Sequence, residues 1–422
     1  MSRSPTHLIN APTVADLEAI ASLRSPVTIR ERCHQLFTLA CADQLEHFRC
    51  DLTQLEPIAN YVIQVMKAEY PQLEIPFHSR WRHFEVGDRS RLDPFEQKLA
   101  TYSALEQARI KYDLAVMSVL IDAGAGTDWR YVEPGTGEIF QRSEGLAVAS
   151  FHLFCQGMFS SDVNHPWQVD ADGLQQLTKS ALMTGFQVSA DNPLVGLEGR
   201  LELLRSLGQV LRLSPHLFDQ ESPRPGHLVQ YLLHQANASQ LPASKVLSAV
   251  LAGLSEIWPG RIAIADINLG DVWYHPQLQA NLPGGQLIPF HKLSQWLTYS
   301  LLEPLQELGI EITDLDQLTG LPEYRNGGLC LDLGLLQAKH PEVKNRCHTP
   351  DSTVIVEWRA LTVSLLDQIA DVIRQQLHLS RTELPLVKIL QGGTWAAGRQ
   401  IAAELRPEGI PPIQIASDGT VF

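Results

Sequence analysis

The sequence has no surplus of basic residues. Its 422 residues include 33 Lys and Arg against 47 Asp and Glu, and the formal net charge is −14 at pH 7. A protein that binds duplex nucleic acid neutralises many phosphates and needs Lys and Arg to do so. We therefore expect no nucleic-acid partner, although a pocket for one small anion is compatible with this charge.

Paired cysteines and long apolar segments are also missing. The six cysteines form no Cys-x-x-Cys pair and no zinc-finger spacing with histidine, so we expect no metal site. Residues 1–10 are polar and lack a signal-peptide pattern, which favours reduced thiols and a cytoplasmic location. The longest apolar run, residues 114–125, is interrupted by Asp122 and falls well short of the roughly 20 residues that span a bilayer. We expect no membrane association.

The motifs of several large enzyme classes are absent. No Gly-x-Gly-x-x-Gly follows a predicted strand, no Gly-x-Ser-x-Gly elbow occurs, and no cysteine has a neighbouring motif that would make it a nucleophile. Residues 391–395 predict a glycine turn before a helix, which could bind an anion through backbone N–H groups. This turn lacks the Lys-Ser/Thr of a P-loop. We expect no organic cofactor.

Apolar residues at helical spacing are abundant and predict a mainly α fold. The helices are expected at residues 13–23, 27–48, 52–70, 95–121 (as a pair), 146–158, 173–185, 197–211, 245–257, 290–309, 329–336, 354–377 and 395–405. Turn residues between β-branched or aromatic stretches predict short hairpins at 128–142 and 262–274. We expect one domain over residues 1–422. The alternative is two helical lobes, about 1–220 and 227–422, separated by the Pro-rich residues 222–226, with the site between them.

An acid, a phenol and a guanidinium follow one another at Glu323, Tyr324 and Arg325, before a helical run. A carboxylate near a helix start is stabilised in its charged form by the helix dipole. An ionised carboxylate is what an oxocarbenium-like sugar transition state requires. The other interpretation is a capping glutamate beside a surface arginine, and both stay open on spacing alone.

Asp122 lies at the end of an apolar helix and should be half buried. Burial of a carboxylate without a partner is costly, so Asp122 has either a hydrogen-bonded structural role or a catalytic one. Trp129 follows at a distance that could fold back over the same site, although core packing explains it equally simply.

The loop at residues 78–84 contains two Arg, two His and a Trp. His78, Arg80 and Arg82 could bind a phosphate or a polar sugar ring, because guanidinium groups make forked contacts to anions. A solvated basic loop is the alternative. The spacing of the two histidines does not favour zinc.

Two further charged pairs occur in predicted helices, and one of them, Glu357 with Arg359, stands in strongly apolar surroundings. His291 and Lys292 begin a predicted helix, where the terminal amides could help them to bind an anion. Glu357 and Arg359 lie within another helix, and since buried charges are usually paired, we expect Glu357 to pair with an arginine. A direct catalytic role for Glu357 is the second interpretation.

Read together, ten segments identify the chain as similar to the uracil catabolism protein 4 family (domain of unknown function 1688). They are HSRWRHF at 78–84, LIDAGAG at 120–126, RSEGLA at 142–147, NPLVGLEGR at 192–200, GDVW at 270–273, PFHKLSQWLTY at 289–299, LTGLPEYRNGG at 318–328, VEWRALT at 356–362, GGTWAAGR at 392–399 and SDGTVF at 417–422. The resemblance spans nearly the whole chain. It implies a role in a uracil breakdown pathway that opens the ring and ends in urea and a ribose product.

A fainter similarity connects the order of these motifs with the queuosine salvage glycohydrolases. That family cleaves a base from ribose phosphate and has a helical fold related to DNA glycosylases. The LPEYR segment resembles its Asp-Tyr-Arg segment with Glu323 in place of Asp, FHK resembles its Phe-Tyr-Lys segment, and VEWR its Glu-Ile-Arg segment. LID falls where that family has an apolar Leu-Asp segment. The Glu-for-Asp difference changes the reach of the acid.

These observations lead to the hypothesis of a ribosylurea-type N-glycoside hydrolase acting on a ribosyl substrate with or without a phosphate. Glu323 would stabilise the ribosyl cation or orient water, and Asp122 or Glu357 would hold the leaving urea or nucleobase. Arg80, Arg82, Lys292 or Arg325 would bind a phosphate or ribose hydroxyls. The alternative is a non-catalytic protein of the same pathway that binds a nucleotide or regulates a partner enzyme.

Overall fold

The computed structural model describes residues 12–258, 261–279 and 283–416. Within these ranges the chain is mainly helical, which confirms the predicted fold class. Its α-helices are α1 (Val14–Leu23), α2 (Pro26–Cys41), α3 (Leu55–Glu69), α4 (Arg80–Phe84), α5 (Leu92–Leu99), α6 (Ala104–Leu120), α7 (Arg142–Cys155), α8 (Ala171–Gln176), α9 (Lys179–Gly185), α10 (Leu197–Leu213), α11 (Pro215–Phe218), α12 (Leu228–Gln235), α13 (Ala243–Leu254), α14 (Lys292–Glu307), α15 (Tyr324–Asp332), α16 (Glu342–Asn345), α17 (Thr353–Leu377), α18 (Leu386–Ile389) and α19 (Trp395–Leu405).

The strands are short and each pairs with one other in the described part of the chain. The antiparallel pairs are β1 (Phe48–Cys50) with β10 (Leu336–Ala338), β2 (Tyr131–Val132) with β3 (Ile139–Phe140), β5 (Ala263–Ile264) with β6 (Ile267–Asn268), and β7 (Val272–Tyr274) with β8 (Leu287–Pro289). The parallel pairs are β4 (Gln240–Pro242) with β9 (Glu311–Thr313), and β11 (Cys347–His348) with β12 (Gln414–Ile415). Both predicted hairpins are confirmed as β2–β3 and β5–β6, whereas β7 pairs with the more distant β8.

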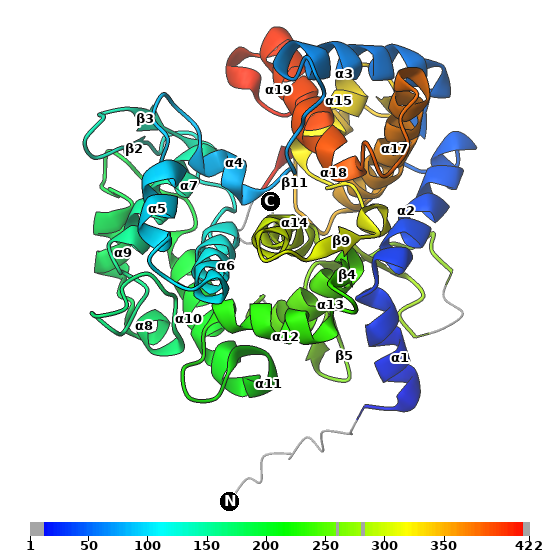
Figure 1. Ribbon diagram of the computed structural model, residues 1–422. Helices are drawn as coiled ribbons and strands as arrows, with labels where there is room; N and C mark the ends of the chain where they lie inside the picture. Colours follow the sequence, from blue (N-terminus) through cyan, green and yellow to red (C-terminus); the bar gives the residue numbers. More distant parts are fainter. Residues whose placement is uncertain (1–11, 259–260, 280–282, 417–422) are drawn as a thin grey trace, which may run out of the picture.

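Helix α14 lies near the centre of the molecule, between two groups of helices (Figure 1). It packs against α6 and α13, and nearly all of its side chains are buried. On one side, α17 packs against α2, α3 and α15, so that the two ends of the chain share one part of the core. On the other side lie the helices from α5 to α11 (Figure 1). This arrangement brings the ends of α6, α14 and α15 toward the middle of the fold.

Several predicted helices are shorter than the apolar pattern indicated. The predicted helix over 27–48 ends at Cys41, because Asp43 adopts a left-handed conformation (φ 58°) and turns the chain toward β1. The predicted helix over 173–185 is two helices, α8 and α9. Leu177 is extended between them (ψ 131°), and the Thr178 side chain caps α9. Periodicity cannot show such breaks, because the apolar spacing continues across them.

The predicted glycine turn at 391–395 is wrong. Residues Leu390–Thr394 form a π-helical turn that leads directly into α19. A Cβ atom on Gly393 would lie 2.8 Å from Val62, and one on Gly392 would lie 2.9 Å from Tyr70. The glycines are therefore present for close packing against α3 and the chain after it, and they do not form an anion-binding loop.

The Pro-rich segment at 222–226 is tied to the core by a buried ion pair. The Arg224 Nε donates to Asp113 Oδ2 at 2.8 Å, and the Gly226 N–H donates to Asp113 Oδ1 at 2.6 Å. Burial raises the pKa of Asp113 to about 6 although Arg224 opposes the shift. The division into one domain or two lobes at this segment stays a prediction.

Candidate active site

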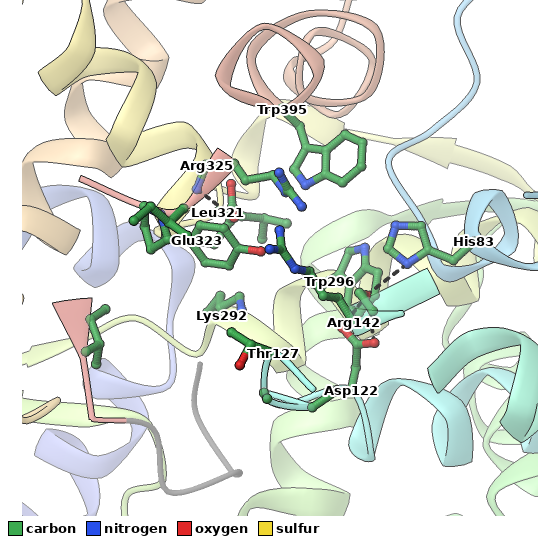
Figure 2. Close-up of a pocket in the computed structure, with 18 of the residues that line it drawn as sticks. His83, Asp122, Thr127, Arg142, Lys292, Trp296, Leu321, Glu323, Arg325 and Trp395 are labelled. Atoms are coloured by element: carbon green, nitrogen blue, oxygen red, sulfur yellow. Dashed lines mark hydrogen bonds between the residues drawn. The ribbon is translucent and has the colours of Figure 1, made fainter. Parts of the chain in front are cut away.

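The ends of several helices meet around a pocket of about 350 Å³. This volume is in the range of small-molecule sites, about 300–1,000 Å³. Its walls come from the start of α4, the loop after α6, and the starts of α7, α14, α15 and α19. The remaining wall is apolar and includes Ile410, Pro411, Ile413 and Ile415. Figure 2 shows charged and aromatic side chains from these distant segments pointing into one cavity.

Glu323 lines this pocket as the N-cap of α15. Its Oε1 accepts the N–H of Asn326 at 2.7 Å, and its Oε2 accepts the N–H of Arg325 at 3.0 Å. The residue is 8% exposed, and burial raises the pKa of its carboxyl although the two amides and Lys292 oppose the shift. Glu323 is therefore both a cap and a pocket carboxylate. Each oxygen keeps a lone pair for a further partner.

Asp122 faces the same pocket from the loop that follows α6. Arg80 Nη1 donates to its Oδ1 at 2.5 Å, and the Ser143 hydroxyl lies 2.7 Å from both carboxylate oxygens. Arg80 is fully buried and does not line the pocket, so it positions Asp122. Burial raises the pKa of Asp122, with Arg80 and Ser143 opposing the shift. Arg200, also buried, donates to the backbone carbonyls of Ile121 and Gly124 and thereby holds this loop.

Cationic side chains lie across the pocket from Asp122 (Figure 2). Burial lowers the pKa of Lys292, and the charges of Glu323 and Asp122 oppose this shift, so the ammonium lies within electrostatic reach of both carboxylates. The Arg325 guanidinium lies 5.1 Å from the Trp395 ring centroid and 5.2 Å from that of Tyr324. Arg325 is 8% exposed, yet no ion pair or side-chain hydrogen bond of its guanidinium is found among the described residues. A buried guanidinium that faces a pocket without such a partner is suited to an anionic or hydroxyl-rich ligand.

One corner of the pocket is aromatic. His83 has its ring centroid 5.3 Å from that of Trp296 and 6.0 Å from that of Trp395. The His78 ring lies 6.3 Å and 5.8 Å from the same two indoles. Burial lowers the pKa of His78 to about 4, and burial together with the Arg80 charge holds the pKa of His83 well below its ordinary value. Both imidazoles are therefore neutral near pH 7.

Six of the sequence-predicted site residues line the pocket. They are His78, Asp122, Lys292, Glu323, Tyr324 and Arg325. They come from distant parts of the chain and share one pocket. Their roles in a reaction stay a prediction.

Glu357 and Arg359 do not line the pocket. The expected pairing of Glu357 with an arginine is wrong. Its Oε1 lies 3.5 Å from His275 Nε2, and its Oε2 accepts the N–H of His47 at 3.2 Å. Arg359 instead makes a forked ion pair with Asp271, at 2.7 and 2.8 Å. Both α17 residues contact partners within the chain. Of Asp122 and Glu357, the two acids left open by the sequence, Asp122 is the one that lines the pocket.

Three other predicted residues also lie outside the pocket lining. The Trp129 Nε1–H donates to the Phe186 carbonyl at 2.9 Å, and its ring is fully buried in the core. His291 is buried with its Nε2 2.9 Å from the carbonyl of Leu23. Arg82 pairs with Glu303 at 3.1 Å. Trp129 therefore has the core-packing position that was its alternative interpretation. His291 and Arg82 are partnered by a backbone carbonyl and by Glu303.

Several pocket residues received no role from the sequence. Arg142 begins α7 with a left-handed backbone (φ 54°), and its Nη2 donates to the Glu408 carbonyl at 3.2 Å. Ser143 and Trp395 also line the pocket. The only signal for them was that they stand in segments shared with the family, at 142–147 and 392–399. Their types and spacing alone do not distinguish them from helix caps and core residues.

No group of three or more His, Cys, Asp or Glu in the described ranges is arranged to hold a metal ion. None of the helices described in the structure has the length and hydropathy of a membrane span.

Comparison with known proteins places the chain in a family. Residues 22–422 match the family described as "Protein of unknown function (DUF1688)". The chain is 41% identical to "Protein urg3" of Schizosaccharomyces pombe (strain 972 / ATCC 24843) over 414 residues, which cover 96% of this chain and 99% of that protein. It is 37% identical to "Uracil catabolism protein 4" of Lachancea kluyveri over 438 residues, again 96% and 99% of the two chains. The chain therefore belongs to the DUF1688 family.

Proposed function

We propose that this chain acts in uracil catabolism and hydrolyses the N-ribosyl bond of ribosylurea or its 5′-phosphate, releasing urea and a ribose product. The pathway is suggested by the name of its relative, "Uracil catabolism protein 4". The observation that carries the reaction is a pair of carboxylates, the buried Glu323 and the partly buried Asp122, that line one small-molecule pocket from different sides (Figure 2). A pocket that binds only an anionic nucleotide has little use for two acids.

In the proposed reaction, the bond from C1′ to the leaving nitrogen breaks as positive charge develops on the ribosyl ring. Glu323 stabilises this charge, because its carboxylate is held in place by two backbone amides and needs no reorganisation. Water then forms the new bond to C1′. One proton of the water ends on the leaving nitrogen and the other remains on the sugar hydroxyl.

Asp122 takes the leaving-group side in this scheme. Its pKa is raised by burial, which favours a carboxyl that can share a proton with the departing urea nitrogen. Arg80 and Ser143 fix its orientation. Arg325 and Lys292 hold the ribose hydroxyls or the 5′-phosphate at the other end of the pocket.

One observation favours the alternative of a non-catalytic nucleotide-binding protein. Both oxygens of Glu323 already cap α15, so its presence in the pocket has a structural explanation. Under this alternative the cations bind the nucleotide phosphate, and no bond is cleaved.

Incubation of the purified chain with ribosylurea and with ribosylurea 5′-phosphate, followed by an assay for free urea, tests the proposal. Enzymatic release of urea from one of the two substrates is the expected result. Wild type is compared with Arg325→Met on both substrates. If wild type has a higher kcat/KM for ribosylurea 5′-phosphate than for ribosylurea, and Arg325→Met loses this difference, Arg325 binds the 5′-phosphate. Binding of the phosphate compound by calorimetry without urea release would instead support the nucleotide-binding alternative.

A further inference from the structure

The aromatic corner of the pocket contains two histidines in an unusual setting. His78 and His83 each contact both Trp296 and Trp395, and all four rings line the cavity. We call these four residues the imidazole corner. The role proposed above for the carboxylates and cations does not use it.

The hydrogen bonds of His83 define where its proton lies. Two groups lie near His83 Nδ1, namely Arg80 Nη1 at 3.3 Å and Ser143 Oγ at 3.1 Å. The serine hydroxyl can donate or accept, whereas a guanidinium can only donate. The bond from Arg80 therefore requires that Nδ1 accepts, and the Ser143 hydroxyl then donates to Asp122 alone. A neutral imidazole with an accepting Nδ1 carries its proton on Nε2. His83 therefore presents an N–H donor at the far edge of its ring. Figure 2 shows the ring with its Nδ1 edge bonded toward the Asp122 side and its other edge turned toward Trp395.

His78 has the opposite tautomer. Its Nδ1 lies 2.9 Å from Gln391 Oε1, and an amide oxygen can only accept, so Nδ1 donates. The Nε2 of His78 therefore carries a lone pair and is an acceptor. Since burial keeps both rings neutral, the two tautomers are assigned by their bonding partners.

Both Nε2 atoms are available to a ligand. Neither has a hydrogen-bonding partner in the described ranges of the chain, and neither is among the fully enclosed polar atoms that lack one. The residues are only 3% and 7% exposed, so their accessible surface is at the pocket they line. The corner thus offers one donor and one acceptor beside the faces and edges of two indoles.

We propose that the imidazole corner binds a neutral, planar amide or urea group, with its carbonyl oxygen accepting from His83 Nε2–H and its N–H donating to His78 Nε2. The indoles supply flat apolar contact to such a group. An anion would gain nothing from a neutral acceptor at His78. The proposal rests on the function proposed above, in which this group is the leaving urea. The corner adjoins Asp122, because Ser143 Oγ lies 2.7 Å from Asp122 and 3.1 Å from His83 Nδ1.

The test measures binding of two ligands by calorimetry. Ribosylurea carries both the carbonyl and a terminal NH₂, whereas its N′,N′-dimethyl analogue keeps the carbonyl and has no terminal N–H. We expect wild type to bind ribosylurea at least about 10-fold more tightly, since a buried acceptor left unpaired typically costs this much. Uridine, which carries the same donor–acceptor edge on a ring, is the third ligand and shows whether the corner also accepts the intact base.

Two variants and a control assign the preference. His78→Phe should bind ribosylurea and its dimethyl analogue with equal affinity. His83→Phe should lower the affinity for the two ligands by about the same factor, because each ligand keeps the carbonyl that accepts from His83. His152→Phe is the matched control, since His152 pairs with Glu133 outside the pocket lining and should retain the wild-type preference. Melting temperatures identify any variant that fails to fold.

The outcomes separate this inference from the proposed reaction. A wild type that prefers ribosylurea through His78 but releases no urea would refute the hydrolase and leave the corner as a urea-binding subsite. A wild type that releases urea with no preference between the two compounds, or with a preference that survives His78→Phe, would overturn the corner alone.

Discussion

Two clusters of buried charge in this protein differ in where they find their partners. On α17, Arg359 forms a forked pair with Asp271, and Glu357 is met by His275 and a backbone amide. At the pocket, Arg325 lies against two aromatic rings with no carboxylate partner among the described residues. Both clusters were candidates for chemistry on the sequence alone.

The pKa shifts of the carboxylates differ in the same way. The Asp271 side chain is 15% exposed, and the Arg359 guanidinium holds its pKa well below the ordinary range. Burial raises the pKa of Asp122 and Glu323, and their partners do not fully compensate. A carboxylate with a lowered pKa is stabilised by the fold. One with a raised pKa costs the fold free energy, which is typical of groups that serve a ligand or a reaction.

The largest expected difference concerns stability. Arg359→Met leaves the Asp271 carboxylate without its forked partner and should lower the free energy of unfolding by about 3–5 kcal/mol. Arg325→Met removes a guanidinium that has no ion pair to lose, and it should cost no more than about 1–2 kcal/mol of cation–π contact. Denaturation of both variants in urea measures the two losses of unfolding free energy. Equal losses would mean that Arg325 has a structural role and would remove the contrast.

Enzymatic turnover should depend on the pocket residues more than on the α17 residues, which is the reverse of the order expected for stability. Asp122→Asn and Glu323→Gln should each reduce kcat/KM for urea release by about 10²–10³. The first removes the carboxyl that shares a proton with the leaving nitrogen, and the second removes the charge that stabilises the ribosyl cation. Glu357→Gln is the matched control, and activity per folded molecule should stay near wild type. Should Glu357→Gln lose as much activity as the pocket variants while folded, the proposed site would be wrong.

The two clusters should also respond to different ranges of pH. The pKa of His78 is about 4 in the folded state against about 6.5 unfolded, so its neutral form stabilises the fold above pH 6.5. This contribution, about 3 kcal/mol, is lost as pH falls from 6.5 to 4. Asp271 has a lowered pKa, so its contribution is lost only below the unfolded value of about 3.9. Denaturation of wild type and His78→Gln between pH 4 and 7 measures the contribution of His78. As pH falls, the variant should lose less unfolding free energy than wild type.

The smallest effect separates the two roles of Glu323. Glu323→Ala removes the cap of α15 and should cost about 1 kcal/mol of stability, whereas Glu323→Asp keeps a good capping residue and should recover most of it. The shorter side chain withdraws the carboxylate from the pocket, so Glu323→Asp should remain stable but slow. A stable and fully active Glu323→Asp would show that the reach of the side chain does not matter.

The helices could be predicted because a 3.6-residue apolar pattern is a local property of the chain. The partner of a buried charge is not local. Arg359 and Asp271 are far apart in sequence, as are Arg80 and Asp122, and nothing in the residues themselves distinguishes one pair as a scaffold and the other as a pocket wall. Asp122 could be nominated because an acid after an apolar stretch needs an explanation, and Glu323 because it precedes a helical run together with Tyr324 and Arg325. Trp395 and Arg142 could not, because an aromatic and a cation at helix starts are common.

The order in which the pocket residues occur along the chain has a consequence for biosynthesis. His78 and Asp122 are made early, Lys292 and Glu323 much later, and the apolar wall at Ile413 and Ile415 lies close to the end of the described chain. A chain emerging from the ribosome therefore exposes both carboxylates before the last wall exists to enclose them. A product that ends before Ile413 lacks this wall, so under the proposed function we expect it to release no urea from ribosylurea.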